Sequence, residues 1–157
     1  MMKSVSMGGN FVLNFGPDGH GNMHQGEDKI AKELGEWMDI NSEAVYGTQH
    51  ADLPTSNYGY FTKKEDQLYL TVFNRPVNDI IRLTIPKNAK EIPVSAQILG
   101  NSDIIEVKHS DIGYDLDKNT YYDLVLPKGF SSKRAFVIKM KLGAKTVNSQ
   151  KLMDAKM

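Results

Sequence analysis

The order of apolar and polar residues divides the chain into a short β/α part and a longer strand-rich part. In residues 10–16, Phe11, Leu13 and Phe15 alternate with the remaining positions, which is the period-two pattern of a short buried strand. In residues 27–40 the apolar positions follow helical spacing instead. The residues on this stripe are Ile30, Leu34, Trp37 and Met38. Near residue 50 the period changes from helical to strand-like.

The second part contains short apolar segments separated by turn-forming residues. The predicted strands cover residues 58–63, 67–74, 80–85, 92–99, 104–108, 120–126 and 134–142. Their near-regular spacing is typical of an antiparallel β-sandwich. We expect domain boundaries that give residues 1–50 to the β/α part, 51–142 to the sandwich and 143–157 to a flexible tail.

The ends of the β/α part carry recognisable signals. Gly16-Pro17 ends the predicted strand, and Asn41 is expected to end the helix in the left-handed conformation. Gly35 is expected to mark a close contact between the helix and a sheet. One β/α unit cannot bury both faces of its strand. The β/α part is therefore expected to belong to something larger, and an all-β antiparallel sandwich is expected to follow it.

Composition excludes several classes of function. Lys plus Arg equals Asp plus Glu, at 19 each, and this zero net charge favours neither nucleic acid nor an anionic membrane as a partner. No run of about 18 apolar residues predicts a membrane span. The chain has no cysteine, which excludes disulfides and thiolate chemistry. Residues 1–7 lack the apolar core of a signal peptide.

Four sequence blocks together carry a family resemblance. They are Gly9–Pro17 (GNFVLNFGP), Asp18-Gly19, Leu34–Trp37 (LGEW) and Asn41–Thr48 (NSEAVYGT). In this order and spacing they resemble the last β/α unit of an α-L-fucosidase of glycoside hydrolase family 29. The usual blocks of that family are approximately G-N-L-L-L-N-I-G-P, D-G, I-G-E-W-L and N-G-E-A-I-Y-G-T. Ser42 departs from this pattern, because the family usually has glycine there.

The resemblance implies a retaining exo-α-L-fucosidase that acts on fucosylated glycans or glycoconjugates. It also implies a mixed fold, in which the last β/α unit of a truncated (β/α)8 barrel is followed by a C-terminal all-β antiparallel β-sandwich. Retention requires two carboxylates about 5 Å apart. In the family the nucleophile comes from an earlier barrel strand, as do the histidines that hold fucose. No acid of this chain is therefore assigned a catalytic role, and we expect the chain to be inactive without an upstream barrel domain.

Two other hypotheses remain. One is a non-catalytic β-sandwich that binds carbohydrate or docks against another domain, and the other is a gene fragment whose product barely folds. The compartment stays open, since family members are commonly periplasmic, secreted or lysosomal and any signal peptide would lie upstream.

Two side chains are candidates for a substrate pocket. Asn14 falls at the C-terminal end of the predicted strand, where active sites of barrels lie. It is either a partner of the sugar or of a catalytic carboxylate, or a satisfied core amide. His20 follows in the glycine-rich loop and could contact a sugar hydroxyl. His20 and His24 lack a third ligand, so no metal is expected. Gly16–Gly21 lacks the order of a phosphate-binding loop, and no cofactor is expected.

Aromatic residues offer a further alternative. Trp37 could stack on a sugar, but its place on a helical stripe favours core packing. Tyr58, Tyr60 and Phe61 begin the first predicted strand of the sandwich. Exposed rings there would form a carbohydrate platform, whereas inward rings would belong to the core.

Overall fold

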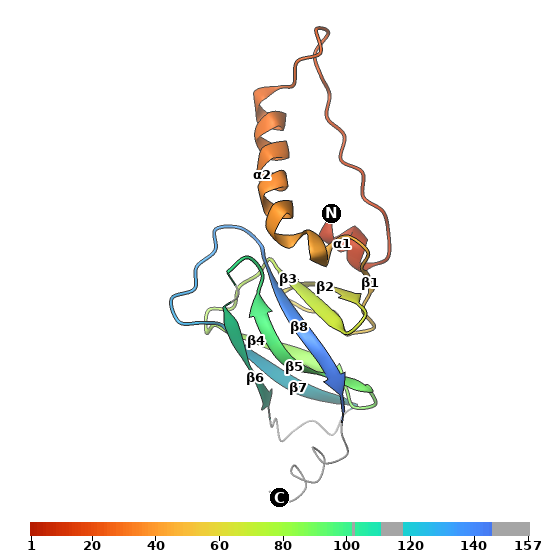
Figure 1. Cartoon of the computed structure of the whole chain (residues 1–157), viewed down its shortest axis with the longest axis vertical. Coiled ribbons are helices and arrows are strands. Elements are labelled where there is room, and N and C mark those ends of the chain that lie inside the picture. The colour runs from red at the N-terminus through yellow and green to blue at the C-terminus, as the bar shows by residue number, and fades with distance from the viewer. Residues whose placement is uncertain (102, 111–117, 146–157) are drawn as a thin grey trace, which may run out of the picture.

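The computed structural model describes residues 1–101, 103–110 and 118–145. A helical N-terminal part stands on a curled antiparallel sheet (Figure 1). The helical part contains α1 (Met2–Ser6), α2 (Gln25–Asn41) and a 3-10 turn, η1 (Ser42–Ala44). None of the helices in these ranges is long and apolar enough to span a membrane.

The sheet contains eight strands among the described residues. They are β1 (Gln49–His50), β2 (Gly59–Lys64), β3 (Gln67–Val72), β4 (Ile80–Pro86), β5 (Glu91–Ile98), β6 (Ile104–Ser110), β7 (Asn119–Val125) and β8 (Phe136–Ala144). Their order across the sheet is β1-β2-β3-β8-β5-β6-β7-β4, and every neighbouring pair is antiparallel. The order places β4 beside β7, although residues 87–118 separate these two strands along the chain.

The main core lies between the two halves of the curled sheet. In β4, Ile81, Leu83 and Ile85 are buried while Arg82 points outward, as strand alternation requires. These side chains belong to one cluster with residues of β3, β5, β7 and β8. The other buried members on those strands are Leu68, Leu70, Val72, Ala96, Ile98, Tyr122, Leu124, Phe136, Ile138 and Met140.

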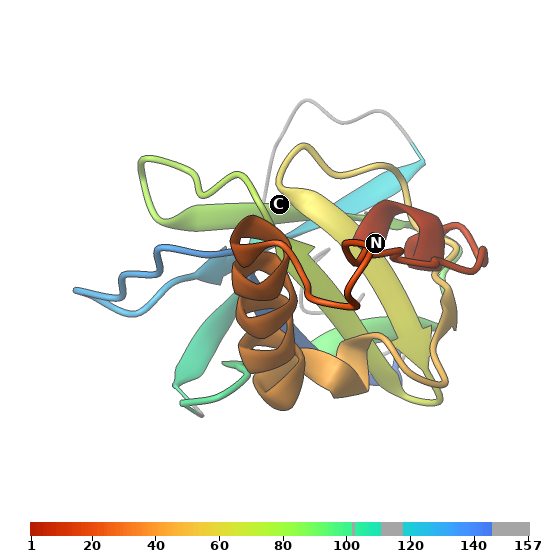
Figure 2. The same cartoon turned by 90° about the horizontal axis from the view of Figure 1, so that it is seen from above.

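Strand β3 is buried on both faces. Leu68 and Leu70 face the main core. Tyr69 faces the other way and is also buried, because it packs in a second cluster with Ala44 of η1 and Val137 of β8. The helical part therefore covers the outer face of β3, and Figure 2 shows α2 standing over this side of the sheet.

The seven strands predicted from the sequence are confirmed with small shifts at their ends. The first hairpin is tighter than expected: Lys64 pairs with Gln67, and Glu65 adopts a positive φ of 54° in the turn. Strand β1 lies at the expected boundary between residues 1–50 and residues 51–142. Strand β8 continues to Ala144, two residues into the predicted tail, of which residues 146–157 lie outside the described residues.

The prediction of a buried strand at residues 10–16 is wrong in this structure. The segment has no strand pairing, and Val12 is 86% exposed. A strand needs a neighbouring backbone to receive its hydrogen bonds. The described part of the chain offers no such neighbour to this segment, so the alternating residues remain extended and exposed.

Two details of the predicted helix are also wrong, although the helix itself is confirmed. Asn41 has a φ of −114° and is not left-handed; its Nδ2 donates to the backbone oxygen of Trp37 at 2.9 Å. Gly35 makes no close contact, because a Cβ built there meets no atom within 4 Å. The contact expected at Gly35 would need a structural element that the described residues do not contain.

Candidate functional site

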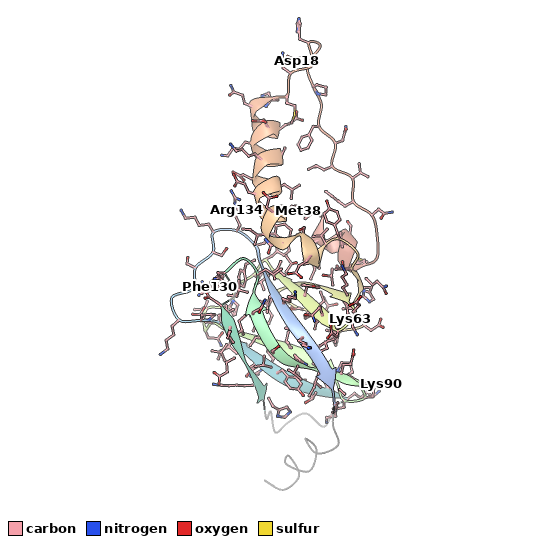
Figure 3. The ribbon with its side chains drawn as sticks, in the orientation of Figure 1. Asp18, Met38, Lys63, Lys90, Phe130 and Arg134 are labelled. Carbon is pink, nitrogen blue, oxygen red and sulfur yellow. The ribbon has the colours of Figure 1, made fainter. Side chains whose placement is uncertain are left out.

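Asn14 and His20 lie on the segment that connects α1 to α2. This segment runs away from the sheet to a tip near Asp18 and returns into α2 (Figure 3). Both side chains are exposed. They share no hydrogen bond in the part of the chain that the structure describes, so the structure does not bring the two candidates together.

Asp18 holds the tip of this segment in a tight loop. Its Oδ1 accepts from the backbone N–H groups of His20 and Asn22, each at 2.8 Å, and its Oδ2 accepts from Asn22 Nδ2 at 3.1 Å. The backbone hydrogen bond from Asn22 is the main cause that lowers the pKa of Asp18. An ionised carboxylate that accepts these hydrogen bonds stabilises the loop. It is poorly suited to protonate a leaving group.

Side chains at the start of α2 form hydrogen bonds with backbone N–H groups of the first turn and of the segment that precedes the helix. His24 is the N-cap, and its Nδ1 accepts from the backbone N–H of Gly26 at 3.1 Å. Glu27, in the first turn, accepts from the backbone N–H of Gly16 at 3.3 Å through Oε1. In the described ranges no group of three or more His, Cys, Asp or Glu side chains could hold a metal ion.

Two polar contacts join α2 to the segment that leads into β8. Trp37 Nε1 donates to the backbone oxygen of Ala135 at 2.7 Å, and Arg134 Nη1 lies 3.0 Å from Glu36 Oε2. The indole also packs against the second buried cluster, which confirms the core interpretation of Trp37. Figure 3 shows Arg134 beside α2. These contacts connect the C-terminal half of α2 to the residues that precede β8.

A second anchor lies under η1. Glu43 Oε2 accepts from Lys139 Nζ at 2.7 Å and from the Tyr69 hydroxyl at 3.1 Å. Burial, followed by the charge of Glu43, raises the pKa of Tyr69. Sequence reasoning missed this cluster. Its only signal was the apolar character of both faces of β3, which indicates a second covering layer.

Cavities flank the helical part on two sides. One, of about 480 Å³, lies between α2 and two sheet loops, with Trp37, Leu99 and Phe130 in its lining. Another, of about 390 Å³, lies between the N-terminal segment and the end of α2, with Phe11 and Tyr46 in its lining. Both cavities lie where the helical part meets a neighbouring segment. Neither lining contains a pair of carboxylates.

The helical part also exposes large apolar side chains. Phe11 is 43% exposed, Leu13 is 42% exposed and Ile30 is 56% exposed, in addition to Val12. Residues 10–16 also have no strand partner within the described residues, and together these features are typical of an element that lacks a neighbour.

Comparisons with known proteins agree on one family. The family model described as alpha-L-fucosidase matches residues 1–43. Among curated proteins, an alpha-L-fucosidase of Dictyostelium discoideum is 33% identical over 55% of this chain, and one of Branchiostoma floridae is 28% identical over 60%. A solved alpha-L-fucosidase of family 29 from Bacteroides thetaiotaomicron is 30% identical, with a TM-score of 0.78 over 91% of this chain.

The match covers only part of each relative. The chain spans 19% of the Dictyostelium protein, 22% of the Branchiostoma protein and 31% of the solved Bacteroides chain. The solved structure is described as a trapped covalent intermediate in complex with 2-fluoro-fucosyl fluoride. The chain is therefore similar to the alpha-L-fucosidases of glycoside hydrolase family 29, and the match is consistent with a C-terminal part of such an enzyme.

Proposed function

We propose that the chain forms the C-terminal portion of a retaining exo-α-L-fucosidase, which removes terminal α-L-fucose from glycoconjugates. Residues 1–50 supply the last β/α unit of the catalytic barrel, and residues 51–142 form the sandwich that braces it. The nucleophile and the acid/base come from barrel strands outside these 157 residues. In retaining glycosidases these two carboxylates lie about 5–5.5 Å apart.

The observation that carries this proposal is the structural likeness over nearly the whole chain. The Bacteroides fucosidase aligns with 91% of this chain, including both the helical part and the sheet, at 30% identity. The two anchors at Trp37 and Glu43 support the bracing role, because a helix fixed at these points keeps its preceding loop in one position.

The exposed segment 10–16 supports the barrel role. Inside a closed barrel this segment gains strand neighbours on both sides, and Phe11 and Leu13 pack against the helical layer. Asn14 then faces the barrel interior near its C-terminal mouth, and His20 lies in the loop above it. From there Asn14 would meet the substrate or a catalytic carboxylate, and His20 would contact a sugar hydroxyl.

A domain exchange tests the proposal. The part of the Bacteroides fucosidase that aligns with this chain is replaced by residues 1–145, and turnover of 4-nitrophenyl α-L-fucoside is measured. We expect the chimera to be active. The Bacteroides barrel cut at the same junction is the control, and it is expected to be inactive, as is the 157-residue chain alone.

Two results would contradict the proposal. The first is a chimera that unfolds cooperatively but shows no turnover. The second is turnover by the chain alone that disappears when one of its own Asp or Glu residues is replaced.

A further inference from the structure

A third cavity, of about 360 Å³, lies at the outer edge of β2. Strand β1 pairs with β2 only at Thr62 and Lys63. The edge from Gly59 to Phe61 therefore has no partner strand within the described residues, and it opens into the cavity. We call this space the β2-edge cavity. Its volume lies in the range of about 300–1,000 Å³ that small-ligand sites occupy.

The apolar side chains that line the β2-edge cavity, which we call its floor, include residues from both faces of β2 and pack against other side chains. The ring of Tyr60 packs edge-on against Phe73, with ring centroids 5.8 Å apart and an interplanar angle of 70°. On the other side, Leu53 and Phe61 pack against the main core. The exposed side chain of Met7 stands at the rim. The floor thus offers apolar surface to a ligand.

Polar groups with free hydrogen-bonding capacity surround this floor. His50 Nδ1 lies 2.7 Å from the backbone oxygen of Ser6, and a carbonyl oxygen only accepts, so Nδ1 carries the proton and Nε2 of the neutral ring is an acceptor. Ser56 Oγ accepts from the Tyr58 N–H at 3.1 Å, which leaves the hydroxyl proton to donate. The hydroxyl of Thr55 is exposed beside it.

The charges around the β2-edge cavity balance. Lys3 contributes one positive charge to the lining. The exposed carboxylate of Asp52 lies 3.7 Å from His50 Nε2 and offsets it. Such a balance favours a neutral ligand over an anion.

We propose that the β2-edge cavity binds a neutral pyranose residue of a glycan. The apolar face of the sugar packs on Tyr60, and its hydroxyl groups donate to His50 Nε2 and accept from the hydroxyls of Ser56 and Thr55. This site lies on the sheet and needs no catalytic group, so it adds a glycan-holding function that does not depend on the proposed fucosidase activity.

The test is a titration of the purified 157-residue chain followed by amide NMR shifts. The probes are methyl α-L-fucopyranoside and methyl β-D-galactopyranoside, each taken to about 50 mM, since single-sugar sites bind in the millimolar range. We expect saturable shifts in residues 50–61 for at least one probe. Tyr60→Ala and Ser56→Ala should each weaken binding about fivefold or more.

A matched control is Tyr46→Ala, because Tyr46 is 68% exposed and lines a different cavity. It should leave the affinity unchanged. Thermal unfolding of every variant checks its fold, and Ser56→Ala, on an irregular loop, carries the test if Tyr60→Ala does not fold. Absence of saturable shifts at residues 50–61 with both sugars overturns the proposal. Competition by acetate or inorganic phosphate overturns it as well, because it identifies an anion site.

Discussion

The indole Nε1 of Trp37 donates a hydrogen bond of 2.7 Å to the backbone oxygen of Ala135, a residue 98 positions further along the chain. Trp37 belongs to α2, and Ala135 directly precedes β8 at the centre of the sheet. This bond connects the helical part to the last strand, so the two ends of the described chain stabilise one another.

The first prediction is that Trp37→Phe destabilises the fold. The substitution keeps a large aromatic ring but removes the donor, so the Ala135 oxygen loses its partner. We expect the free energy of unfolding to fall by about 1–3 kcal/mol in urea denaturation. Ile30→Ala, at a position on α2 that is 56% exposed, is the control and should change it by less than about 0.5 kcal/mol. Equal losses in both variants would contradict the role of the bond.

The second prediction concerns alkaline stability. Burial and then Glu43 raise the pKa of Tyr69, and burial raises the pKa of Tyr122. Between the normal tyrosine pKa of 10.0 and the raised value, the unfolded chain loses this proton more readily than the folded chain. Stability should therefore fall as the pH rises above about 10.

Tyr69→Phe isolates the contribution of this residue. The variant should show a shallower alkaline loss of stability than the parent, measured as thermal midpoints across the pH series. Tyr46→Phe, at an exposed tyrosine, should leave the alkaline slope as it is. An unchanged slope in Tyr69→Phe would count against the buried-hydroxyl explanation.

The third prediction concerns acid stability. The hydrogen bonds from the Arg82 guanidinium hold the pKa of Asp123 below its usual range, with contacts of 2.8 and 2.9 Å. The unfolded chain binds a proton at this site before the folded chain does, so the stabilisation is present at neutral pH and is lost as the pH falls below about 4. Asp123→Asn should flatten this part of the stability curve. Asp39→Asn, at an exposed carboxylate on α2, is the control.

The fourth prediction contrasts two glycines. At Gly59 an added Cβ would collide with the backbone oxygen of Thr71, whereas at Gly35 it would meet nothing within 4 Å. Gly59→Ala should therefore lower the free energy of unfolding by about 1–3 kcal/mol, and Gly35→Ala should raise it by about 1 kcal/mol through helix propensity. Stabilisation by both substitutions would show that β2 can shift away from β3.

The fifth prediction tests Asn14 in the fucosidase chimera. If Asn14 positions the sugar or a carboxylate, Asn14→Ala removes about 1.4 kcal/mol or more of that interaction and lowers kcat/KM about tenfold. Asn10→Ala, deeper in the proposed barrel strand, should mainly lower the melting temperature. If Asn14→Ala keeps full activity but loses stability, Asn14 is only a core amide and takes no part in catalysis.

Much of the sheet could be predicted because its signal is local. The alternation of apolar and polar residues along Ile81, Arg82 and Leu83 predicts which side chains face the core. It depends only on the geometry of a single strand. The helical stripe around Trp37 is local in the same sense, and α2 forms where the pattern predicts it. The family blocks are also read along the chain without any tertiary information.

The remaining features depend on which elements meet in space. Residues 10–16 have the pattern of a strand, yet they have no strand partner among the described residues, because strand hydrogen bonds need a second backbone alongside. The second buried face of β3 exists only because α2 and η1 pack over Tyr69. The sequence by itself therefore determined the periodicity of each element, through local backbone geometry. The tertiary structure alone decided the partners of each element, since burial and pairing are set by contacts between residues far apart in the chain.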